Sequence, residues 1–131
     1  FALEGSLLTY VYMNHQYGMT LVHGGQADSA RAVFGRMLSR APNDRARGQR
    51  SLGFLEAWEG RWRSAARWFA DASRTSVGEQ QWTSAARSAA LAGNVLALAG
   101  DTAQARAQLR TAAQYARAHD VDVRFARFAA V

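Results

Sequence analysis

Apolar residues in this chain recur every three or four positions, in runs separated by polar links that contain glycine. Alanine fills many of these positions, and a strand-like alternation of β-branched residues is nearly absent. Such spacing gathers apolar side chains on one face of a helix, and alanine is the strongest helix former. The pattern predicts an all-α fold. The expected helices span residues 3–23, 26–40, 44–59, 61–76, 79–99, 102–118 and 121–130.

Three segments of the chain align on a glycine that lies between two expected helices. These glycines are Gly25, Gly60 and Gly100. Each is expected to end a helix, because glycine adopts the left-handed backbone conformation without strain. After each glycine come an alanine, where two helices can cross closely, and then a large apolar residue that can fill the space between them. The pairs are Ala30 and Phe34, Ala65 and Phe69, and Ala105 and Leu109.

Another glycine precedes each of these by seven positions, at Gly18, Gly53 and Gly93. Glycine inside a helix costs about 1 kcal/mol relative to alanine. Its recurrence in the same register predicts that the backbone is approached closely at all three positions.

Two other features set helix boundaries. Asp44 and Asp101 are expected at helix N-termini, where an acidic side chain caps backbone N–H groups and complements the helix dipole. The interval from Gly60 to Gly100 is longer by five positions than the interval from Gly25 to Gly60. The extra residues are expected to lengthen the helix that begins near Glu79.

This register resembles the tetratricopeptide repeat (TPR) family, in which two helices alternate in repeats of about 34 residues. The resemblance covers roughly residues 10–117. Pro42 takes the family's proline place in the first repeat, and Val77 stands there in the second. The family's Leu-Gly pair is matched by Tyr17-Gly18, Leu52-Gly53 and Ala92-Gly93.

The resemblance implies one domain over residues 1–131, built as a right-handed superhelical array of antiparallel helix pairs, a TPR-like α-solenoid. It implies repeats at about 10–43, 44–78 and 79–117, followed by a capping or truncated helix at 118–131. Because the first residue is Phe1 rather than methionine, we expect a domain cut from a longer protein. A GC-rich genome also produces an arginine-only, alanine-rich composition, so part of the charge signal is discounted. The repeat register and the lack of a catalytic motif suggest a segment of a larger bacterial regulator or scaffold.

Charge and composition narrow the chemistry. All 16 basic residues are arginine, and with 10 acidic residues the formal net charge is +6, which favours acidic partners. Without lysine the chain has no phosphate-loop, protein-kinase or Schiff-base chemistry. Without cysteine it has no disulfides or thiolate metal sites. No G-x-S-x-G motif occurs, and the carboxylates are scattered. The sequence therefore predicts no catalytic residues, no cofactor and no enzymatic activity.

One group of residues has a spacing that suits a metal. His15, Met19 and His23 recur every four positions, so a helix would place all three on one face, where they could ligate copper or haem iron. No carboxylate or cysteine completes such a site. The preferred interpretation is a groove or packing surface without metal.

The family resemblance also implies a concave groove, lined by the first helix of each repeat, in which peptides bind. Aromatic side chains and arginines mix on that face, which suits an acidic peptide that also carries an apolar side chain. In the alternative interpretation Phe54 and Trp58 pack in the core and the arginines are solvated. The predicted partner-binding residues are Tyr12, His15, Met19, Arg47, Arg50, Phe54, Trp58, Arg87 and Asn94, with His23 and Leu98 on the same face.

A known specificity of the family is not expected here. Its clamp for terminal carboxylates uses basic residues and asparagines at fixed places in the first helices. Here His15, Met19, Ser51 and Leu91 stand in four of those places, and only Arg87 matches.

The sequence thus favours a protein-interaction module that binds a peptide or partner protein in its groove. RNA binding is an alternative, disfavoured because acidic residues intersperse the basic run and no groove code repeats. Stacking of exposed repeat ends into homo-oligomers is a further alternative. No signal-peptide pattern and no run of about 20 mostly apolar residues occurs, so we expect no membrane span. The cytoplasmic location that we expect is taken from composition alone, which lacks cysteine. The basic run considered for RNA binding consists of Arg36, Arg40, Arg45, Arg47 and Arg50.

Overall fold

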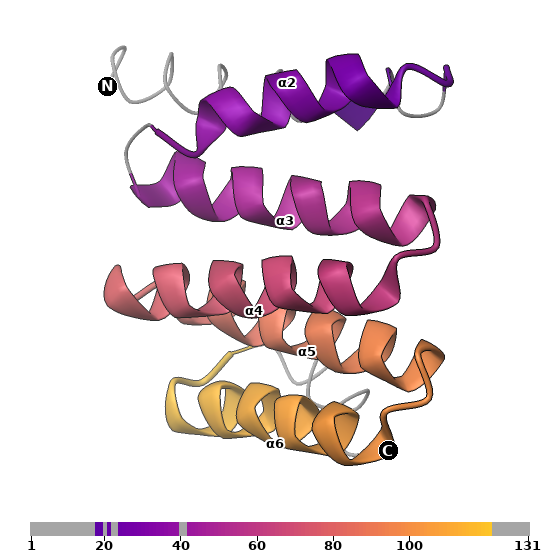
Figure 1. Cartoon of the computed structure of the whole chain (residues 1–131). Helices are drawn as coiled ribbons and strands as arrows, with labels where there is room; N and C mark the ends of the chain where they lie inside the picture. Colours follow the sequence, from indigo (N-terminus) through magenta and orange to yellow (C-terminus); the bar gives the residue numbers. More distant parts are fainter. Residues whose placement is uncertain (1–17, 20, 22–23, 40–41, 122–131) are drawn as a thin grey trace, which may run out of the picture.

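The computed structural model describes residues 18–19, 21, 24–39 and 42–121, and no strand occurs among them. Helices dominate this part of the chain (Figure 1), so the predicted all-α fold is confirmed. The helices are α2 (Ala27–Met37), α3 (Pro42–Trp58), α4 (Trp62–Gly78), α5 (Trp82–Leu98) and α6 (Thr102–Ala118).

Successive helices pack against each other: α2 on α3, α3 on α4, α4 on α5 and α5 on α6. Figure 1 shows the chain turning back between successive helices, so that they follow one another from α2 at the top to α6 at the bottom. None of the helices in the described residues has the length and apolar character that a membrane crossing needs.

The four helices from α3 to α6 have one common length. Each has 17 residues, and links of three residues separate them. The prediction of a longer helix beginning near Glu79 is therefore wrong, because α5 begins at Trp82 and matches its neighbours. The shorter first interval arises instead from α2, which has 11 residues where α4 has 17 residues.

The links have the left-handed residue that the glycine pattern predicts. Gly25, Gly60 and Gly100 have φ angles of 79°, 80° and 84°. At the end of α3, Arg61 N–H donates to the Glu56 carbonyl at 2.9 Å and Gly60 N–H to the Ala57 carbonyl at 3.0 Å. This pair of bonds satisfies carbonyls that the helix end would leave without donors.

Two more helix ends, those of α4 and α6, have the same geometry without glycine. Gln80 after α4 and Asp120 after α6 have φ angles of 58° and 53°. Gln81 N–H donates to the Ser76 carbonyl at 2.8 Å, and Val121 N–H to the Ala116 carbonyl at 3.0 Å, so the hydrogen-bond pattern is repeated. A side chain in this conformation is disfavoured by roughly 1–2 kcal/mol, and packing of α5 and α6 must offset it.

The start of α6 is capped as predicted. Asp101 precedes the helix, and its carboxylate accepts a hydrogen bond from Gln104 N–H at 3.1 Å. Asp44 lies in the first turn of α3, which begins at Pro42. Proline suits a first helical position because its missing N–H would have no partner there.

The three glycines predicted to allow a close approach meet large side chains of the following helix. A Cβ atom built on Gly53 would lie 2.6 Å from the Phe69 ring, and one on Gly93 would lie 2.7 Å from the Leu109 side chain. Gly18 meets the Phe34 ring in the same way. The predicted close approach is confirmed at all three positions.

The core changes character along the chain. In its first half it contains large side chains, and Phe34, Met37, Leu55 and Phe69 are almost fully buried. In its second half alanine dominates, because the buried face of α5 is largely alanine. Small side chains bring helix axes toward the short end of the range of about 8–10 Å. The alanines that follow the aligned glycines, Ala30, Ala65 and Ala105, are buried as predicted.

Four charged side chains connect α2, α3 and the link to α4. The buried carboxylate of Glu56 accepts from Arg31 at 2.6 Å and from Arg61 at 2.5 Å. Glu59 contacts the same two arginines at 2.8 and 3.0 Å. The hydrogen bond from Arg61 is the main cause that lowers the pKa of Glu56 from 4.5 to about 2; burial opposes the shift, and Arg31 adds to it. The network stabilises the ionised form of Glu56.

Gly53→Ala is expected to destabilise the fold. The new methyl group would enter the Phe69 ring, and overpacking of this kind costs about 1–3 kcal/mol, more than the gain of about 1 kcal/mol in helix propensity. Gly35→Ala in α2 is the control, because a Cβ there meets nothing within 4 Å. Urea denaturation should show the first variant less stable and the second at least as stable as the parent chain. Equal stabilisation by both would contradict the close approach.

Glu56→Gln is expected to lower the free energy of unfolding by about 2 kcal/mol at neutral pH, since it removes charge-assisted hydrogen bonds from a buried site. Because folding lowers the pKa of Glu56, its stabilisation is complete above pH 4.5 and is lost as the pH falls toward 2. Denaturant titrations at several pH values should show a smaller acid-dependent loss in the variant. The more exposed Glu59→Gln should change stability by less than about 1 kcal/mol. An unaltered acid profile in Glu56→Gln would refute the assignment.

Candidate partner-binding surface

Large apolar side chains that are exposed gather on two helices. Phe54 and Trp58 on α3 are 36% and 60% exposed, and Leu98 on α5 is 65% exposed. Within the described residues, these are the large hydrophobic side chains with such exposure. Trp58 and Leu98 are the last residues of two helices of equal length, so they occupy equivalent places.

The same register extends this surface along both helices. Residues separated by seven and eleven positions share one helix face, because the helix has about 3.6 residues per turn. On both α3 and α5 this face begins with an arginine and ends with the exposed apolar residue. We call it the α3–α5 stripe; its members are Arg47, Phe54 and Trp58 on α3 and Arg87, Asn94 and Leu98 on α5.

Phe54 belongs both to the stripe and to the packing beneath it. Its ring meets the buried Phe69 ring edge-to-face, with centroids 5.1 Å apart and an interplanar angle of 75°. The contact fixes Phe54 while part of its surface remains exposed. Trp58 is more exposed, so the alternative interpretation that both aromatic side chains pack in the core is wrong for Trp58. For Phe54 this interpretation is correct in part, because the ring packs on Phe69 and is still 36% exposed.

Arg50 connects the two helices of the stripe. It is partly buried and donates to the hydroxyl of Ser84 in the first turn of α5. Ser84 is in turn 2.9 Å from the Ser76 hydroxyl on α4. Burial is the main cause that lowers the pKa of Arg50 to about 10, and the neighbouring charges of Arg47 and Arg87 lower it further. Arg47 and Arg50 on α3 and Arg87 on α5, all predicted as partner-binding residues, are thus near enough for their charges to act on one another.

The remaining predicted residues are placed differently. Met19 is partly buried and packs against the core between α2 and α3, so it does not extend the exposed surface. Asn94 and Arg87 are exposed, and Arg47 is partly buried. Tyr12, His15 and His23 lie outside the described residues.

No group of three metal-ligating side chains occurs in the described part of the chain. The predicted face of His15, Met19 and His23 has only Met19 within that part, so the structure does not describe it.

Sequence reasoning missed the serines that support Arg50. Ser84 and Ser76 lie on later helices, far from Arg50 in the chain, and no motif connects them. Their role depends on the packing of α4 between α3 and α5.

A hollow lies between α4 and α6. It has a volume of about 250 Å³ and is lined by Arg63, Arg67, Leu96 and Asp101 among others. Arg63 contacts Asp101 at 3.3 Å, and Asp101 also caps α6. Arg63 and Asp101 therefore serve the structure, and the α3–α5 stripe is the stronger candidate site.

Comparisons with protein-family models, with curated proteins and with solved structures find no match to this chain. The TPR resemblance stays a prediction, and the surface is interpreted from its own geometry.

Arg50→Met is expected to raise the free energy of unfolding by about 1 kcal/mol, because it removes a partly buried charge that two other arginines repel. Thermal and urea unfolding in a buffer of chloride salts should show the gain. Arg110→Met on α6 makes the same change of charge at an exposed position and should leave stability nearly unaltered. A loss of stability in Arg50→Met would mean that its bond to Ser84 outweighs the repulsion.

Proposed function

We propose that this chain is a protein-interaction module and that the α3–α5 stripe is its working surface. The observation that carries the proposal is the exposure of Phe54, Trp58 and Leu98 on equivalent faces of two helices. Exposed apolar side chains grouped beside charged ones are typical of protein-binding sites.

The regular helix register supports a TPR-like array. Left-handed glycines end α3 and α5, and each of these helices receives a large side chain from the helix that follows. These features fit a right-handed superhelix of antiparallel helix pairs, in which α3 and α5 are first helices. Their exposed stripe would then line the concave groove, and the chain would be part of a larger regulator or scaffold.

The chemistry of the stripe indicates the kind of partner. Trp58 and Leu98 offer apolar surface at one end of it, and aromatic side chains commonly supply most of the binding energy at an interface. Arginines occupy the other end and can hold carboxylates through two parallel hydrogen bonds. An acidic peptide that also carries an apolar side chain satisfies both.

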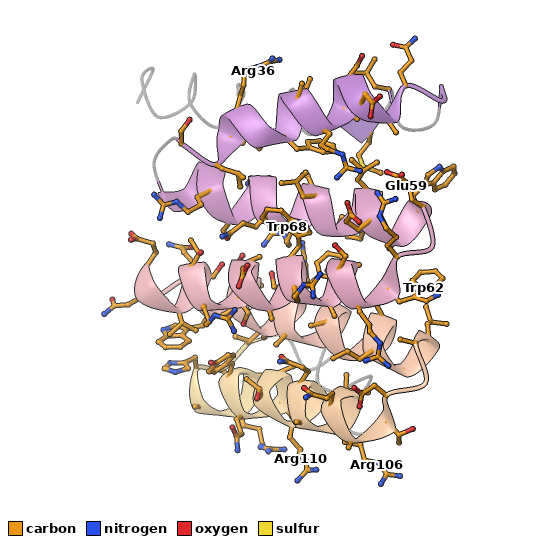
Figure 2. The ribbon with its side chains drawn as sticks, in the orientation of Figure 1. Arg36, Glu59, Trp62, Trp68, Arg106 and Arg110 are labelled. Carbon is orange, nitrogen blue, oxygen red and sulfur yellow. The ribbon has the colours of Figure 1, made fainter. Side chains whose placement is uncertain are left out.

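The two alternatives receive less support. The basic run proposed for RNA binding is divided among elements, since Arg36 is on α2 and Arg45 donates to the Leu38 carbonyl at 3.2 Å. Stacking of exposed ends is opposed at α6, where Arg106 and Arg110 extend away from the other helices (Figure 2). Two arginines of like charge do not suit an apolar stacking interface.

A random-sequence peptide library selected on the immobilised chain is expected to yield peptides that combine Asp or Glu with an aromatic or aliphatic residue. The double variant Trp58→Ser, Leu98→Ser should bind these peptides at least tenfold more weakly, which is about 1.4 kcal/mol of binding free energy, because it lacks the apolar contacts. Fluorescence anisotropy with labelled peptides measures the change. Both side chains are exposed, so their loss opens no cavity.

Gln114→Ser, at an exposed position on α6, is the control and should bind like the parent chain. Peptides that bind the double variant as tightly as the parent would place the site elsewhere. Selection of basic peptides, or binding of RNA with a strong salt dependence, would reject the proposed partner class.

A further inference from the structure

We propose that a cluster of three arginines between α3 and α5 is a binding site for a phosphoryl group carried by the partner protein. The cluster comprises Arg47, Arg50 and Arg87, with the hydroxyl of Ser84 beside it. The inference rests on the proposed function, and it adds a class of partner, a phosphorylated peptide, to the acidic peptides already considered.

The positions of the four groups follow from two helix turns and one contact. Arg50 on α3 donates a hydrogen bond to the hydroxyl of Ser84 on α5. Arg47 stands three residues before Arg50, and Arg87 stands three residues after Ser84, so each is a neighbour on its own helix face. All four groups therefore lie close to the contact between Arg50 and Ser84.

The charged groups that act on Arg50 are all of one sign. Both charged groups that lower the pKa of Arg50 are arginines, and the first turn of α5 contains no acidic residue. Like charges gathered around a partly buried guanidinium destabilise the fold unless an anion joins them. Arrangements of this kind are concentrated at functional sites.

At the C-terminal end of α3, by contrast, the arginines that stabilise the fold are paired with carboxylates. Glu56 and Glu59 meet Arg31 and Arg61, so two carboxylates balance two guanidinium groups. Arg50 has a serine where Arg31 and Arg61 have carboxylates. The contrast indicates that an external anion can supply the negative charge that Arg50 lacks.

A phosphoryl group fits the cluster better than a carboxylate. It carries a charge of about −1.5 to −2 at neutral pH and three strong acceptor oxygens, whereas a carboxylate carries one charge. Guanidinium groups bind phosphate through paired hydrogen bonds. Arg87 has a further interaction of its own, so Arg50 and Arg47 are expected to supply most of the donors.

The position of the cluster on the stripe connects it with the apolar contacts. Phe54 follows Arg50 by one helix turn, and Trp58 follows Phe54 by another. A partner that places a phosphoryl group on the arginines can therefore place an apolar side chain on these rings. The expected partner is a peptide with a phosphorylated residue close to an aromatic or aliphatic one.

The first test uses small probes and the whole chain. Isothermal titration with N-acetyl-phosphoserine amide should give saturable binding, at least tenfold tighter than with N-acetyl-glutamate amide at the same ionic strength. Inorganic phosphate should raise the melting temperature more than chloride does at equal ionic strength. Arg50→Met should weaken phosphoserine binding at least tenfold, and Arg110→Met, with the same change of charge on α6, should leave it unaltered. Arg47→Gln provides a second variant that keeps Arg50 and its contact with Ser84, and it should also weaken phosphoserine binding.

Several outcomes would overturn the proposal. Equal binding of phosphoserine amide to Arg50→Met and to the parent chain would place the phosphate elsewhere. Inorganic phosphate that binds as tightly as phosphoserine amide, and is not displaced by a phosphorylated form of a library peptide, would indicate a site for free anions. Absence of any phosphate effect would reject the site. The library peptides would still test the stripe separately, so the proposed function could stand while this inference fails.

Discussion

The arrangement of this protein depends on the contact between a glycine inside one helix and a large side chain of the next. Phe69 lies where a Cβ atom of Gly53 would be, and Leu109 lies in the same way against Gly93. The contact brings two backbones close together while it buries a large apolar group. Each helix pair thereby obtains a fixed depth of packing, which neither a glycine-free helix nor a small side chain could give.

This constraint determines which faces of the helices remain at the surface. Gly53 and Gly93 lie on the helix faces that meet the following helix, so residues on the opposite side of α3 and α5 are at the surface. Because α3 and α5 have equal lengths, Trp58 and Leu98 occupy equivalent positions on them. Phe54 lies at the boundary, since its ring rests on Phe69 and is still partly exposed. The candidate site is thus a consequence of the same packing that forms the core.

Charges are distributed over α3 according to two different physical requirements. Glu56 is buried and is held by Arg31 and Arg61, which favours its ionised form and links α2, α3 and the following turn. Arg50 is close to other arginines and has a serine hydroxyl as its hydrogen-bond acceptor. The first arrangement balances its charges within the fold. The second leaves positive potential at the stripe, where an anionic partner can use it.

The sequence by itself determined the helical fold, the left-handed turns at Gly60 and Gly100 and the close approach at Gly53, because these follow from local backbone preference and helical spacing. It also indicated the exposed face with Trp58. It could not indicate the left-handed turn at Gln80, since glutamine has no preference for that conformation. Only the tertiary structure decided the burial of Met19, the length of α5 and the bond between Arg50 and Ser84. These depend on which surfaces meet between segments far apart in the chain, or on where packing ends a helix, and no local pattern encodes either.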